Sequence, residues 1–63
     1  MKQANTKRAK RIEKTIVGLY DAADVQASIV DALTDLRHLC DVRELAFHEA
    51  DKMAYRHYSE EKR

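Results

Sequence analysis

Proline is absent from this 63-residue chain, and glycine occurs only once, as Gly18. Folds rich in β-strands need several such residues in their hairpins, because glycine and proline supply the backbone angles that tight turns require. A chain almost without them is left with helices joined by short polar connections. We therefore predict an all-α fold.

Three segments repeat apolar residues at the spacing of one helical face, which predicts helices over residues 6–17, 21–42 and 47–60. Residues 1–5 have no apolar anchor and are expected to be a basic frayed tail of the same single domain. The second helix has the longest apolar face and is the expected scaffold. Its face, called the scaffold stripe below, consists of Val25, Ile29, Ala32, Leu33, Leu36, Leu39 and Cys40.

The boundaries of these helices follow from individual residues. Gly18 is expected to stop the first helix, and Asp21 is expected to cap the second. The short connection 42–46 predicts that helices 21–42 and 47–60 form a helical hairpin. The first helix is expected either to cross this hairpin or to project from it.

The small size of the chain limits the core that it can build. A domain of this length buries a modest share of its surface, and the lone Cys40 excludes an internal disulfide. The remaining apolar surface is expected to be buried by self-association, for example as a homodimer with a four-helix core. No segment approaches the roughly 20 apolar residues of a membrane span, and Met1 precedes a polar, basic stretch, so a cytoplasmic location is expected.

Charge is unevenly distributed along the chain. Residues 1–14 hold six bases and one acid, about +5, whereas ten acids and six bases leave residues 15–63 at about −4. Helical spacing predicts a basic face and an acidic edge, each a candidate site for partner binding. The basic face consists of Lys7, Lys10, Arg11 and Lys14, and the acidic edge consists of Asp24, Asp31 and Asp35.

Residues with possible metal or catalytic chemistry are few. Asp35 and His38 share one helical face, a spacing found in metal sites of helix bundles, but such sites need several carboxylates that point inward. Cys40 lies on the scaffold stripe, where a cysteine usually packs as a small hydrophobic side chain. We therefore expect no metal, no cofactor and no catalytic residue, and predict that the chain is not an enzyme.

The basic face has several interpretations. It is suited to an acidic protein surface, or to the phosphates of nucleic acid in a salt-sensitive and sequence-independent manner. Sequence-specific DNA binding is disfavoured because no tight glycine turn marks a helix-turn-helix, and membrane binding because the helix lacks aromatic anchors. There are two simpler alternatives. The basic face could be a solvated surface that only aids solubility, or the whole chain could serve only as an oligomerisation module.

The motif Asp35-Leu-x-His38, followed by Phe47-x-x-Ala50 and then His57-Tyr58, resembles small helical proteins of bacteriophages and bacterial mobile elements. Members of that group carry Gly and Asp in the loop before the phenylalanine, where this chain has Glu44 and Ala46. The resemblance implies a mobile-element setting in a bacterial host cell, and it supplies no catalytic residue.

This setting leads to an expected function. The chain is expected to be a non-enzymatic protein-binding module that inhibits or modulates a host complex, such as a CRISPR-type immune effector. The alternative is a small nucleic-acid-binding regulator that uses the basic N-terminal helix.

Overall fold

The computed structural model describes residues 3–62. These residues form three helices, α1 (Gln3–Tyr20), α2 (Val25–Val42) and α3 (Phe47–Glu61), and no strand. The predicted all-α, three-helix fold is confirmed. Helix α1 extends beyond the predicted range 6–17 at both ends, because the chain stays helical through Gly18 and begins its helix at Gln3.

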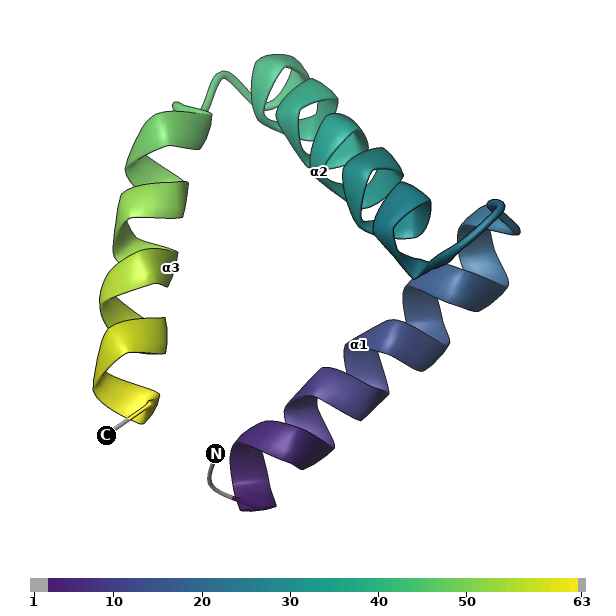
Figure 1. Ribbon diagram of the computed structural model, residues 1–63. Helices are drawn as coiled ribbons and strands as arrows, with labels where there is room; N and C mark the ends of the chain where they lie inside the picture. Colours follow the sequence, from purple (N-terminus) through teal and green to yellow (C-terminus); the bar gives the residue numbers. More distant parts are fainter. Residues whose placement is uncertain (1–2, 63) are drawn as a thin grey trace.

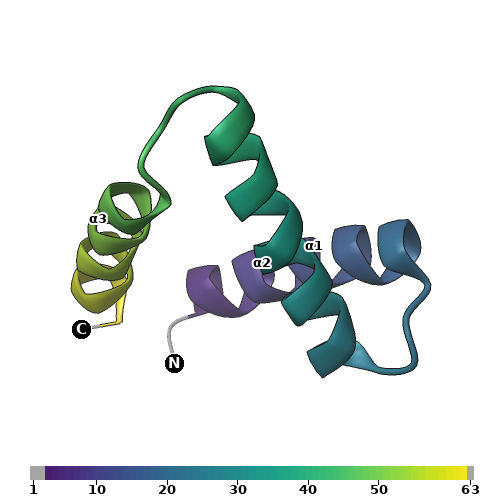
Figure 2. The same cartoon turned by 90° about the horizontal axis from the view of Figure 1, so that it is seen from above.

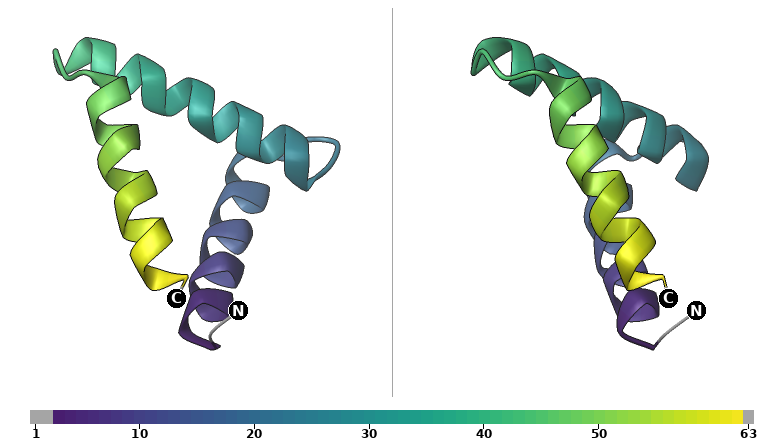
Figure 3. Two further views of the ribbon diagram at one scale, coloured as in Figure 1. Left: turned by 60° about the vertical axis from the view of Figure 1, so that its left-hand side comes forward. Right: turned by 90° about the vertical axis from the view of Figure 1, so that its left-hand side faces the viewer.

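The helices lie as the three sides of a triangle (Figures 1 and 3). Helix α1 crosses α2 at one corner, which is one of its two expected positions, and the crossing is clearest from above (Figure 2). Helices α2 and α3 fold back as an open hairpin that widens from their connection. The ends of α1 and α3 meet at the third corner. The Cα atoms span 35 × 29 × 14 Å, so the molecule is flat.

Two side chains are buried among the described residues, and both lie where α1 crosses α2. Ser28 is 1 % exposed and Ile16 is 8 % exposed. The small side chain of Ser28 allows α1 to approach α2 closely, so Ile16 is covered at this crossing. The core is therefore confined to one corner of the triangle, and it lies beside the scaffold stripe instead of along it.

The connection between α1 and α2 differs from its expected form. Gly18 does not end the first helix; Asp21 does, with a φ of 47° and an N–H that donates to the Val17 carbonyl at 3.2 Å. Aspartate tolerates this left-handed conformation better than most residues. Asp24, and not Asp21, is the N-cap of α2, since its Oδ1 accepts from the Ala27 N–H at 2.8 Å. The second helix consequently begins at Val25.

The predicted frayed tail 1–5 also differs. Residues 1–2 lie outside the described residues, and the rest of the tail belongs to α1. Asn5 contacts the far end of the chain, because its Nδ2 donates to the backbone oxygen of Glu61 at 2.7 Å. This hydrogen bond between distant residues, which no local sequence pattern predicts, therefore stabilises the first turns of α1.

The corner between α2 and α3 is held by a backbone cap and one ring contact. Glu44 has a φ of 57°; its N–H donates to the Asp41 oxygen at 3.2 Å, and the Leu45 N–H donates to the Cys40 oxygen at 2.7 Å. These bonds satisfy the last carbonyls of α2, in a cap that usually has glycine at its left-handed position. The Arg37 guanidinium carbon lies 4.3 Å from the centroid of the Phe47 ring.

We expect Glu44→Gly to raise the free energy of unfolding by about 0.5–1 kcal/mol. The left-handed conformation costs a side chain with a Cβ roughly 1–2 kcal/mol, and the greater freedom of glycine in the unfolded chain offsets part of this gain. Urea unfolding at one protein concentration measures the change. Glu44→Ala removes the charge but keeps the strain, so an equal gain in that variant would contradict the backbone explanation.

Candidate interaction surface

The basic face lies on the side of α1 that points away from α2. Its four residues are all exposed, and the helical spacing sets them opposite the buried Ile16. Within residues 3–62 the one ion pair joins Arg8 to Glu61, so none of the four cations has an acidic partner there. The structure therefore brings Lys7, Lys10, Arg11 and Lys14 together as an exposed row of positive charge.

The acidic edge is divided between structural and exposed carboxylates. Asp24 caps α2, as described above, and Asp35 accepts a hydrogen bond from the Tyr20 hydroxyl at 2.7 Å. Asp31 lies between them in the sequence and is exposed, with no hydrogen bond or ion pair inside the described chain. Two of the three predicted residues thus have roles in the fold, and Asp31 is the carboxylate most available to a partner.

The bond between Tyr20 and Asp35 joins the last residue of α1 to the middle of α2. The hydrogen bond to Asp35 raises the pKa of Tyr20 above its ordinary value, and desolvation and the negative charges of Asp35 and Asp31 act in the same direction. A group whose pKa is raised in the folded state contributes stability below its unfolded pKa. That contribution is lost as the pH rises through the folded pKa.

We expect Tyr20→Phe to lower the thermal unfolding midpoint at neutral pH. The difference in midpoint between the variant and the wild type should become smaller above about pH 10, where the tyrosine hydroxyl ionises. The reason is that the variant lacks the donor to Asp35 at every pH. Thermal unfolding followed by circular dichroism from neutral to alkaline pH measures both effects. Tyr55→Phe is the matched control, because the exposed Tyr55 hydroxyl makes no hydrogen bond to the described part of the chain.

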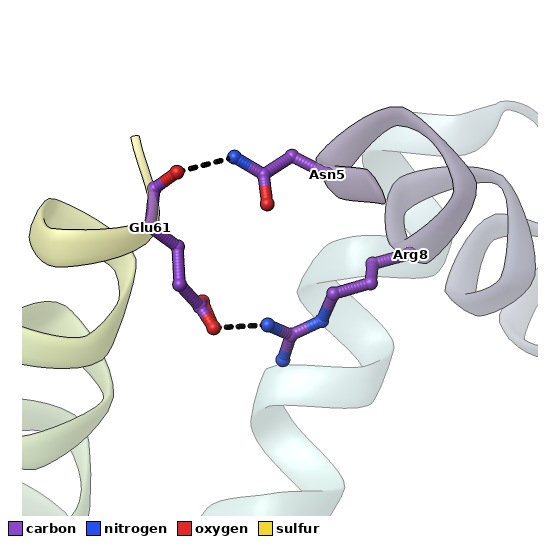
Figure 4. A network of polar contacts seen from close by, with 3 residues as sticks. All are labelled: Asn5, Arg8 and Glu61. Carbon is purple, nitrogen blue, oxygen red and sulfur yellow. Dashed lines mark hydrogen bonds and ion pairs between the residues drawn. The ribbon is translucent and has the colours of Figure 1, made fainter. Parts of the chain in front are cut away.

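The ends of α1 and α3 are joined by a small polar cluster, called the terminal clasp here (Figure 4). Asn5 donates to the backbone oxygen of Glu61, and the Arg8 guanidinium pairs with the Glu61 carboxylate. Both side chains of the ion pair are well exposed, at 57 % and 40 %, so it contributes at most about 1 kcal/mol. The clasp closes the triangle without building a core.

A cleft of about 890 Å³ lies beside the terminal clasp, between α1 and α3. Ala9 and Ala54 leave this space open because their side chains are small, and the Tyr58 ring forms a larger apolar wall. His57, which belongs to the motif His57-Tyr58, also lines it. The lining residues are Asn5, Arg8, Ala9, Ala54, His57, Tyr58, Glu61 and Lys62.

The scaffold stripe is an exposed apolar feature of the surface. Its five large side chains are between 42 % exposed, for Val25, and 53 % exposed, for Leu39, while Ala32 and Cys40 are half-buried. A fully buried side chain of this size is stabilising by about 1.5–3 kcal/mol, so each half-exposed one forgoes a large part of that amount. The predicted core face is therefore in place on α2, but this chain alone does not cover it.

No metal-binding arrangement is found among residues 3–62, since no three histidine, cysteine, aspartate or glutamate side chains lie close enough together to hold an ion. Asp35 bonds to Tyr20, and Cys40 is a free, half-buried thiol. In the same part of the chain no helix is long and apolar enough to cross a membrane. The surface is thus characterised by three features: the basic face, the scaffold stripe and the cleft.

Comparisons with models of protein families, with curated proteins and with solved structures find no match to this chain.

Proposed function

We propose that the chain is a non-enzymatic protein-binding module of a phage or mobile element, which inhibits or modulates a host complex such as a CRISPR-type immune effector. The observation that carries this proposal is the basic face, four exposed cations without an acidic partner in the described chain. Charge complementarity of this kind speeds and orients docking onto an acidic surface. The resemblance of its short motifs to those of phage proteins supports the mobile-element setting.

The helix that carries the basic face is attached at both ends. Tyr20 bonds to Asp35 at its C-terminal end, and Arg8 and Asn5 contact Glu61 near its N-terminal end. These contacts hold the four cations in one orientation relative to the rest of the molecule. Binding to a helix that is already held in place costs less conformational entropy than binding to a segment that must first become ordered.

The alternative function is nucleic-acid binding through the same four cations. It is favoured by the absence of acidic partners for them within residues 3–62, and it predicts a definite salt dependence. If four phosphates are neutralised, the logarithm of the affinity for duplex DNA should fall with the logarithm of salt concentration with a slope of about −3.6. A protein partner gives no reason for this particular slope.

The test is a pull-down of the tagged chain from a lysate of bacteria that express the candidate effector, with and without nuclease, followed by reconstitution from purified components. One stoichiometric complex that survives nuclease and loses effector activity in the presence of the purified chain is the expected result. Loss of every bound component after nuclease treatment, together with the steep salt slope on random DNA, would establish the alternative instead.

A further inference from the structure

The total surface of the chain is too large for a complete folded domain. A folded monomer of 7.3 kDa is expected to expose about 4200 Å², whereas this chain exposes 5765 Å². The excess of about 1600 Å² is twice the roughly 800 Å² that each partner contributes to a standard protein interface. The area available for contact thus lies in the range of an obligate dimer.

The scaffold stripe is part of this exposed surface. It runs along α2 from Val25 to Leu39, about 21 Å at the rise of an α-helix. None of its positions is charged, so its burial would leave no charged group of the stripe unpaired. The acidic edge flanks the stripe, and α1 packs on that flank through Ser28 and the bond between Tyr20 and Asp35. The centre of the stripe is therefore left open for another protein surface.

We infer that a second copy of this chain covers the scaffold stripe, in a twofold symmetric contact in which the α2 helices of the two copies pack against each other. The core of a 63-residue chain must be completed as the chain folds, and a second copy is the one surface present wherever the chain is made. A twofold contact needs a surface that is complementary to itself, which an uncharged apolar stripe satisfies. The basic face, on the far side of α1, stays free in this pair.

This inference does not depend on the proposed function, because it concerns the purified chain without a host component. Sedimentation equilibrium is expected to give a mass of two chains. The thermal midpoint is expected to rise with protein concentration, as it does when folding and association are linked. A wild-type chain that stays monomeric over the measured range, with a midpoint independent of concentration, would overturn the inference.

A matched pair of variants tests the surface itself. Leu36→Lys places a charge at the centre of the scaffold stripe, and we expect it to weaken association at least about 100-fold. Thr34→Lys adds the same charge on the opposite side of α2, where Thr34 is exposed, and should remain dimeric. Whether the dissociated Leu36→Lys chain stays folded or not, loss of the dimer in this variant alone supports the inference. A dimer that survives Leu36→Lys, or that is lost equally in both variants, would overturn it.

Discussion

Ser28→Leu is expected to lower the free energy of unfolding by about 2–3 kcal/mol and to leave much of the chain unfolded at room temperature. Ser28 is 1 % exposed where α1 crosses α2, so the two additional heavy atoms of a branched leucine side chain cannot be accommodated there without separating the two helices. A domain this small is expected to have only about 3–5 kcal/mol of stability from its core. Urea unfolding followed by circular dichroism, at fixed protein concentration, measures the loss.

Ser28→Ala is the matched control, since it keeps the side chain small and should change stability by less than about 1 kcal/mol. The pair separates steric effects from the loss of the hydroxyl. If Ser28→Leu unfolds at the same urea concentration as the wild type, then α1 does not pack on α2 through this residue in solution. That result would place α1 elsewhere, and the position of the basic face relative to α2 would have to be revised.

The helices could be predicted from the sequence because helical periodicity is a local property. The absence of proline and the spacing of apolar residues in three segments are sufficient to predict three helices, and α2 ends where its pattern ends, at Val42. The stops were less predictable. Gly18 is acceptable inside a helix. Asp21 and Glu44 adopt left-handed conformations, which residues other than glycine rarely adopt and which the sequence does not predict.

The packing could not be predicted, because it depends on contacts between distant residues. A stripe of leucine, isoleucine and valine suggests a buried face, yet α1 packs beside it on the small Ser28. The terminal clasp joins Arg8 to Glu61 across most of the chain, and no local pattern indicates it. The basic face could be predicted from spacing alone because exposed side chains need only share one side of a helix. The acidic edge was predicted less well, because Asp24 caps α2 and Asp35 accepts a hydrogen bond from Tyr20.

The double variant Lys10→Glu, Lys14→Glu is expected to weaken binding of the host partner at least about 100-fold, or about 2.7 kcal/mol, without loss of helicity. Both residues are exposed and opposite Ile16, so reversal of their charges alters the surface and leaves the crossing of α1 and α2 intact. The two new glutamates repel an acidic partner surface, so the association rate should also fall. Surface plasmon resonance measures this rate separately from the dissociation rate.

The control for this experiment is Lys52→Glu, Arg56→Glu, a pair with the same spacing and the same change in net charge, exposed on α3. If both double variants weaken binding equally, the effect is due to net charge, and the basic face has no special role. If only the α1 variant loses binding, the four cations act as a site.

The salt dependence then identifies the ligand. A slope for random DNA that becomes shallower by about 2 in the α1 variant indicates phosphate contacts. Unchanged, weak DNA binding together with a lost protein complex indicates that α1 docks on an acidic protein.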